Sequence, residues 1–311
     1  ARSYSTFAED ARQIRPTFFC SVPHLLEKLY TEFTREEAGQ GDLQRMVSSW
    51  ARGGAEGGFL SGLRRKVADT LVYGRLRERF GGRLRFVVSG AAPLQAQIGA
   101  FLHELGLEVL EGYGLAETAG VASLNRLDTN RFGTVGTPVE GVETALEEDG
   151  ELRLRGKNVT PGYWQSDATV LSATDPDGWF RTGDLCRVDD DGYLTVVDRK
   201  RNIILTATGK VIPPAPISEA LRVDPLIDQV VICGDGRPFI TALISVDQDA
   251  LLQFGADSGI EGAPEALLRH EVVYAAIDRR IATVNATLAP HERVQKFAIL
   301  SSQPSISEGV L

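Results

Sequence analysis

Apolar residues in the first part of the chain alternate between short runs and helical spacing. The run at 16–20 predicts a strand, and the leucines that recur after Pro23 predict a helix. Pairs of glycines indicate a loop-rich stretch over 35–62, and the pattern of 63–80 is typical of a basic amphipathic helix. These segments indicate alternating strands and helices.

A strand–helix–strand unit follows. Residues 84–88 form an apolar run, residues 94–105 have helical spacing, and residues 107–110 form a second apolar run. In an open parallel sheet, ligands bind beyond the carboxyl ends of the strands. The loops after these two strands, 89–93 and 111–118, are therefore expected to face one pocket.

After residue 130 the apolar pattern changes. Short apolar runs flank acidic turns that end in glycine, within 142–154 and within 185–197, and each pair predicts a β-hairpin. The second turn contains the three aspartates of 189–191. Their spacing does not fit an EF-hand calcium loop, so a plain turn is predicted. This region is expected to be antiparallel β.

The last third alternates strand and helix again. Strands are predicted at 230–233 and 239–246, with helices near 216–222, 248–254 and 264–287. The change from hairpins to this new block places a domain boundary at 198–202.

Composition limits the function without identifying it. The 311 residues are 43% hydrophobic, which suits one large domain and a smaller one. The net charge of -9 argues against nucleic-acid binding by bulk electrostatics and leaves room for a local cationic pocket. The cysteines are scattered, which favours a reducing cytosol, and the histidines lack metal-ligand spacing. No apolar run approaches the ~20 residues of a membrane helix, and no signal pattern opens the chain.

Three segments in series have the chemistry of a nucleotide site. In the first, glycines free the backbone, an aromatic ring offers a face for a purine, a carboxylate suits Mg²⁺, and a hydroxyl suits phosphate. These residues are Glu111, Gly112, Tyr113, Gly114, Glu117 and Thr118. Alone, this segment is equally compatible with a glycine-rich turn and an exposed glutamate.

The second and third segments add two fixed charges. Asp184 follows a turn glycine and is suited to accept both ribose hydroxyls, although such an aspartate is often only a turn former. The Arg199 guanidinium is suited to bind a negatively charged group, and a solvated basic cluster after a strand is the less favoured alternative for 198–201.

These motifs together resemble the adenylate-forming ligase superfamily, the AMP-forming acyl-CoA synthetases. The segment 113–117 is similar to their Tyr-Gly-x-Thr-Glu signature, 179–184 to Trp-x-x-Thr-Gly-Asp, and 198–201 to Asp-Arg-x-Lys. The resemblance implies that Tyr113 stacks on adenine and that Glu117 binds Mg²⁺. Ala116 stands where the family has a phosphate-binding threonine, and Thr118 is the candidate substitute.

The resemblance also implies roles outside the first segment. The loop that begins Ser89-Gly90-Ala91 is similar to the family's adenine loop. Arg199 would bind ribose or phosphate, and Arg201 would be the pivot of a mobile lid. Gly209 lies in the loop that lines the family's pantetheine tunnel.

The predicted fold class is therefore α/β. Residues 1–199 would be the C-terminal part of a large domain, with 1–130 α/β and 131–199 mainly antiparallel β, and 200–311 a small α+β lid domain. The family's phosphate loop and lid lysine have no match here. Together with the start at Ala1 and the uncapped end, this suggests a piece of a longer protein, although a processed N-terminus would explain the start equally well.

The predicted activity is the AMP-forming ligation of a long-chain fatty acid to CoA, because the stretches 15–30 and 158–164 resemble the bacterial long-chain enzymes. ATP, Mg²⁺ and CoA are the implied cofactors and substrates, and the cytoplasm is the implied location. Two alternatives stay open: an acyl-AMP ligase that delivers to a carrier protein, and a non-catalytic nucleotide-binding fragment. Acyl length, oligomeric state and peripheral association with the inner face of the membrane also stay open.

Overall fold

A computed structural model of the protein describes residues 7–38, 78, 80–166 and 169–300. Contacts divide the chain into two compact units. The first comprises Ala1–Thr182 with Cys186–Val196, and the second comprises Gly183–Leu185 with Val197–Leu311. The predicted domain division at 199/200 stays a prediction. The predicted helix over 63–80 and most of the predicted loop over 35–62 fall outside the described residues.

The first unit contains a five-stranded sheet in the order β1-β2-β3-β4-β5. Its first three strands pair in parallel, and β4 and β5 are antiparallel additions. The strands are β1 (Phe18–Ser21), β2 (Phe86–Ser89), β3 (Glu108–Tyr113), β4 (Ser123–Leu124) and β5 (Thr137–Pro138). The helices are α1 (Phe7–Ile14), α2 (Pro23–Ala38) and α6 (Ala96–Glu104).

The apolar side chains of this sheet and its helices are buried against one another. Leu26 of α2, Leu102 of α6 and Val87 of β2 are each fully buried in one hydrophobic cluster. The strand–helix–strand prediction over 84–110 is thus confirmed. Helix α2 begins at Pro23 as predicted and continues to Ala38, so the expected loop-rich stretch does not start at residue 35.

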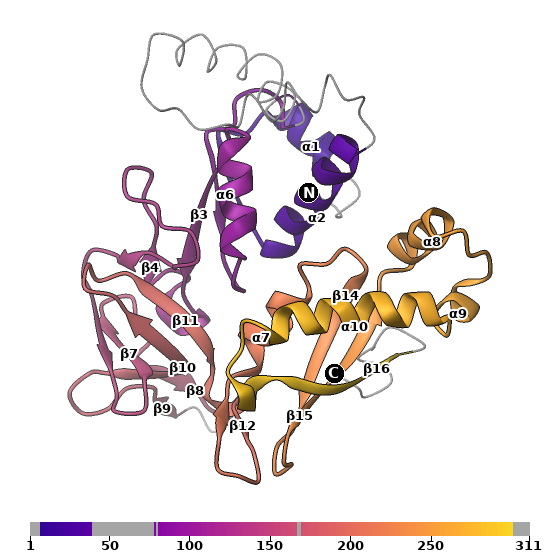
Figure 1. Cartoon of the computed structure of the whole chain (residues 1–311). Coiled ribbons are helices and arrows are strands. Elements are labelled where there is room, and N and C mark those ends of the chain that lie inside the picture. Colours follow the sequence, from indigo (N-terminus) through magenta and orange to yellow (C-terminus); the bar gives the residue numbers. More distant parts are fainter. Residues whose placement is uncertain (1–6, 39–77, 79, 167–168, 301–311) are drawn as a thin grey trace. The chain divides into compact units, whose positions relative to one another are not determined.

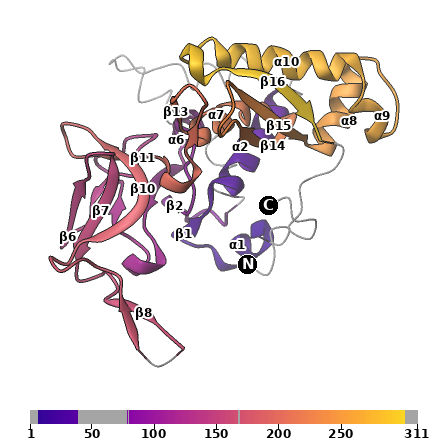
Figure 2. The same cartoon turned by 90° about the horizontal axis from the view of Figure 1, so that it is seen from below.

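The predicted antiparallel region is a four-stranded sheet in the order β11-β10-β7-β6. Its strands are β6 (Val142–Leu146), β7 (Glu151–Gly156), β10 (Phe180–Val188) and β11 (Leu194–Arg199). A separate hairpin of β8 (Gly162–Trp164) and β9 (Val170–Ser172) was not predicted, because its strands are too short to show a period. Figure 2 shows its β8 arm extending away from the antiparallel sheet.

The aspartate-rich segment between β10 and β11 forms a turn, as predicted. The Asp189 carboxylate accepts hydrogen bonds from the amides of Asp191 and Tyr193, and Arg131 forms ion pairs with Asp189 and Asp191. Within the described part of the chain, no group of three or more His, Cys, Asp or Glu side chains could hold a metal ion.

The second unit is built around a three-stranded sheet in the order β14-β15-β16. The strands β14 (Ile227–Cys233) and β15 (Ile240–Val246) are antiparallel, and β16 (Val294–Ile299) pairs with β15 in parallel. A small hairpin joins β12 (Ile204–Leu205) and β13 (Val211–Ile212). The helices are α7 (Pro214–Leu221), α8 (Gln248–Asp257), α9 (Pro264–Leu267) and α10 (Glu271–Asn285).

Helix α10 runs across one face of this sheet (Figures 1 and 2). It presents Val273, Ile277 and Ile281 at helical spacing to the same buried cluster as Ile240 and Ile244 of β15. The prediction of a single helix over 264–287 is wrong in one respect, because the structure has two helices there, α9 and α10. His270 lies at the break, and its Nδ1 accepts a hydrogen bond from the Val272 amide and caps the start of α10.

Candidate nucleotide-binding site

Two predicted nucleotide loops lie side by side at the carboxyl ends of parallel strands. Ser89, the last residue of β2, is in register with Glu111 of β3. A Cβ atom at Gly90 would lie 3.3 Å from the carbonyl oxygen of Gly112, and Ala91 has a positive φ of 70°. The loops therefore approach each other closely at Gly90, where an added Cβ would be tight against the Gly112 carbonyl. The Ser89 hydroxyl is buried and has no hydrogen-bond partner among the described residues.

Glu111 ties two loops together. Its side chain is buried, and its two carboxylate oxygens accept hydrogen bonds from the amides of Leu94 (3.2 Å) and Gly133 (3.1 Å). A buried carboxylate needs such donors in place of the water that it loses on burial. Glu111 therefore orders the loop after β2, and its direct contact with a nucleotide stays a prediction.

Tyr113 ends β3 and is only 9% exposed. It belongs to a buried cluster with Ala122, Leu152 and Leu194. Packing of this kind fixes the ring, and its stacking on adenine stays a prediction.

The predicted metal-binding glutamate sits on a tight turn. A Cβ atom at Gly114 would overlap the carbonyl oxygen of Gly120, so only glycine fits there. In the following 3-10 turn (Ala116–Thr118), the Thr118 hydroxyl accepts from the Leu115 amide at 2.8 Å and donates to the Leu115 carbonyl at 3.0 Å. Thr118 is fully buried, so it closes the turn, and its contact with phosphate stays a prediction.

The segment 158–163 supports this turn and was not assigned a role from the sequence. The Asn158 side-chain amide donates to the Thr118 carbonyl at 3.1 Å, and the Thr160 backbone amide donates to the Glu117 carbonyl at 2.7 Å. The Tyr163 hydroxyl donates to Glu117 Oε1 at 2.9 Å. This hydrogen bond, followed by burial, raises the pKa of the Tyr163 hydroxyl. The resemblance of 158–164 to the family was the one sequence signal for this segment, but it did not indicate which residues the segment contacts.

The second unit contains the predicted ribose-binding pair. Asp184 is 3% exposed, and Arg199 Nε lies 3.3 Å from Asp184 Oδ1. The Arg199 side chain is half exposed. The buried carboxylate is thus compensated by a guanidinium that keeps donors available to solvent or ligand.

Asp198 organises the segment that carries Arg199 and Arg201. It is buried, and its Oδ2 accepts from the Ala215 amide at 2.7 Å, in the first turn of α7. Its Oδ1 accepts from the Arg199 amide at 2.7 Å and from the Asn202 side chain at 3.3 Å. Sequence reasoning missed this role because the helix that Asp198 caps lies 17 residues further along the chain. Arg201 lies in the short turn Lys200–Asn202 that follows.

Gly209 lies in the turn between β12 and β13. Its φ is +74°, and a Cβ atom there would meet nothing within 4 Å. The Thr206 hydroxyl accepts from the Lys210 amide at 3.0 Å across this turn. Asp235, in the β14–β15 turn, accepts from the Leu205 amide at 3.0 Å, so the hairpin is attached to the main sheet of its unit.

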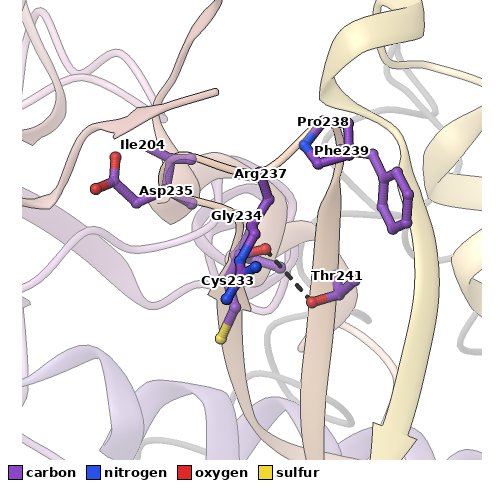
Figure 3. Close-up of a pocket in the computed structure, with 9 residues that line it drawn as sticks. Ile204, Cys233, Gly234, Asp235, Arg237, Pro238, Phe239 and Thr241 are labelled. Atoms are coloured by element: carbon purple, nitrogen blue, oxygen red, sulfur yellow. Dashed lines mark hydrogen bonds between the residues drawn. The ribbon is translucent and has the colours of Figure 1, made fainter. Parts of the chain in front are cut away.

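A hollow of about 670 Å³ lies beside that hairpin (Figure 3). Cys233, Arg237 and Phe239 are among the residues that line it, and the Thr241 hydroxyl donates to the Cys233 carbonyl at 3.4 Å. Its walls combine apolar side chains with the exposed Arg237 guanidinium, the Asp235 carboxylate and the Thr241 hydroxyl.

Two family models match most of this chain. Residues 1–164 match the model described as AMP-binding enzyme, and residues 201–308 match the AMP-binding enzyme C-terminal domain. The chain belongs to the AMP-binding enzyme family. The family and fold class predicted from the motifs are thereby confirmed.

Named relatives agree with this assignment. The chain is 40% identical over 298 residues to long-chain-fatty-acid–CoA ligase FadD15 of Mycobacterium bovis. This match covers 92% of this chain and 49% of that protein. It is 31% identical over 334 residues to human long-chain-fatty-acid–CoA ligase ACSBG1, covering 96% of this chain and 46% of that protein. The chain thus spans about half the length of these relatives.

The fold also matches solved adenylation domains. The A-PCP didomain of the carboxylic acid reductase from Segniliparus rugosus, in complex with AMP, superposes with a TM-score of 0.68 at 23% identity. That match covers 100% of this chain and 40% of the didomain. No helix among the described residues is long and apolar enough to cross a membrane.

Proposed function

We propose that the protein to which this chain belongs is an AMP-forming long-chain fatty acid–CoA ligase. The observation that carries the proposal is the 40% identity, over 298 residues, to a long-chain-fatty-acid–CoA ligase. The juxtaposed loops after β2 and β3 support it, because ligands of open parallel sheets bind at this edge.

In the first half-reaction, an oxygen of the fatty acid carboxylate attacks the α-phosphorus of ATP, and pyrophosphate leaves. The adenine would lie against the loop of Ser89, Gly90 and Ala91 and against Tyr113. Asp184 would accept the ribose hydroxyls. The half-exposed guanidinium of Arg199 would hold Asp184 and face the phosphates, which fixes the nucleotide in line for attack.

Glu117 fits a magnesium site. Mg²⁺ prefers oxygen ligands and is commonly held by one or two carboxylates together with substrate phosphates. Glu117 supplies one such carboxylate on a turn fixed by the hydrogen bonds of Thr118, and one of its oxygens is already oriented by Tyr163. When bound, the ion would offset negative charge on the phosphate oxygens.

In the second half-reaction, the CoA thiol attacks the acyl carbon, and AMP leaves with the oxygen that came from the carboxylate. Arg201 would be the pivot between the two steps, and the turn at Gly209 would approach the pantetheine arm. Glycine suits this position because its open surroundings allow close approach by a ligand. The substrates would be a long-chain fatty acid, ATP and CoA, and the reaction would take place in the cytoplasm.

Product analysis tests this proposal. The full-length protein, supplied with palmitate, ATP, Mg²⁺ and CoA, should release equal amounts of AMP, pyrophosphate and palmitoyl-CoA. A protein that formed AMP and pyrophosphate but transferred palmitate only to a carrier protein would be an acyl-AMP ligase. Release of ADP, or no nucleotide product at all, would contradict the proposal.

A further inference from the structure

We propose that Tyr163 is a positioning residue for Glu117: its hydroxyl fixes the carboxylate in the orientation in which it receives the metal–nucleotide complex. This inference rests on the proposed function, because it deepens the role given there to Glu117. It assigns a task to β8, the first strand of the β8–β9 hairpin, for which the family-like run 158–164 indicated no contact partner.

The contact itself is specific. The Tyr163 hydroxyl donates to Glu117 Oε1 at 2.9 Å, across 46 residues of sequence. Among the described residues, Glu117 takes part in no ion pair, and its other oxygen receives no hydrogen bond. The tyrosine therefore holds one carboxylate oxygen and leaves the other available for a cation.

The backbone around the tyrosine fixes where its hydroxyl lies. Asn158 and Thr160 bond the 158–163 segment to the carbonyls of Thr118 and Glu117, on the same turn that carries the carboxylate. A Cβ atom at Gly162 would overlap the carbonyl oxygen of Leu171 on the paired strand. Donor and acceptor are thus held by one hydrogen-bonded assembly in one unit.

A hydrogen bond to a metal-binding carboxylate reduces its rotational freedom before the metal arrives. Loss of such supporting partners typically costs 10–100-fold in metal affinity or activity. Tyr163 is 42% exposed, so solvent weakens the hydrogen bond. We therefore expect an effect near the lower end, about 10-fold.

The test compares two substitutions that remove only a phenolic oxygen. Tyr163→Phe deletes the proposed contact. Tyr274→Phe is the matched control: Tyr274 is 46% exposed, and its hydroxyl bonds the Phe297 carbonyl at 3.4 Å in the other unit. Glu117→Gln is the reference for loss of the carboxylate.

The readout is the affinity of the full-length protein for Mn²⁺, used as a spectroscopic probe in place of Mg²⁺. Free Mn²⁺ is counted by electron paramagnetic resonance with α,β-methylene-ATP present, so no turnover is needed. Tyr163→Phe should weaken Mn²⁺ binding about 10-fold, with an unchanged melting temperature. Raising Mg²⁺ should restore its ligase activity, which a folding defect would not allow. Tyr274→Phe should bind Mn²⁺ like the wild type.

Three outcomes would overturn the inference. If Tyr163→Phe binds Mn²⁺ as tightly as the wild type while Glu117→Gln does not, the tyrosine has no positioning role and the proposed function stands. If Glu117→Gln binds Mn²⁺ normally, the metal role of Glu117 is wrong, and the role of Tyr163 with it. If the wild type binds no Mn²⁺ with the nucleotide, the inference fails together with the nucleotide–metal site of the proposed function.

Discussion

Replacing Gly114 by alanine should disturb the turn that carries Glu117. A Cβ atom at this position would overlap the Gly120 carbonyl oxygen and lie 2.7 Å from its carbon and 2.8 Å from Val121 Cα. Favourable carbon contacts lie at about 3.5–4.0 Å, so two backbone segments must separate. Overpacking typically costs about 1–3 kcal/mol. Because the obstacle is backbone and cannot change rotamer, we expect the upper end, about 3 kcal/mol.

Urea unfolding followed by tryptophan fluorescence measures this cost. Trp50, Trp164 and Trp179 are the three tryptophans and all fall in the sequence range of the first unit. With a slope of about 2 kcal/mol per M, the midpoint should fall by about 1.5 M urea. Gly141→Ala is the matched control, because Gly141 has φ +82° and nothing within 4 Å of its Cβ position. Its free energy of unfolding should fall by only about 1 kcal/mol, which is the cost of placing alanine in the left-handed backbone conformation.

The two variants should also differ in ATP affinity. Gly114→Ala moves the turn of Glu117 and should weaken binding of MgATP, whereas Gly141→Ala should leave it unchanged. Equal midpoints for the two variants would mean that the close approach of Gly114 to Gly120 is relieved at no cost, contrary to this prediction.

Two more predictions concern carboxylates outside this turn. Asp198→Ala should destabilise the second unit by about 2–3 kcal/mol, because the Ala215 amide at the start of α7 loses a buried charged acceptor. Hydrogen exchange of the α7 amides measures this loss. Unchanged protection of these amides would contradict the capping role of Asp198. The pKa of Asp189 is lowered, first by the hydrogen bond from the Tyr193 amide and also by Arg131. A lowered pKa adds stability above the unfolded value of about 3.9 that is lost as the pH falls through the folded value. In Asp189→Asn the urea midpoint should therefore fall less steeply as the pH is lowered. The same fall in the variant and the wild type would contradict this prediction.

Patterns local in sequence predicted most of the first sheet. Continuous apolar runs predicted the strands β2 and β3, and helical spacing predicted the helix between them. In the structure these elements bury their apolar residues in one cluster. The turn at Asp189 followed from its residue types. Strands of two or three residues, such as β8 and β12, are too short to show a period and were missed.

The side-chain contacts that order the candidate site could not be predicted in the same way. Asp198 meets Ala215 across 17 residues, and Tyr163 meets Glu117 across 46. Such pairs depend on how hairpins and turns fold back, which no local pattern encodes. The motifs therefore predicted which residues bear chemistry, but not which partners hold them.

We propose above that the protein to which this chain belongs activates the fatty acid as an acyl-adenylate. The most direct test follows oxygen from palmitate labelled with oxygen-18 in its carboxylate, in a reaction of the full-length protein with ATP, Mg²⁺ and CoA. Attack of the carboxylate on the α-phosphorus predicts that the AMP released carries one labelled oxygen, detected by mass spectrometry. AMP without label, or label found only in inorganic phosphate, would contradict the account.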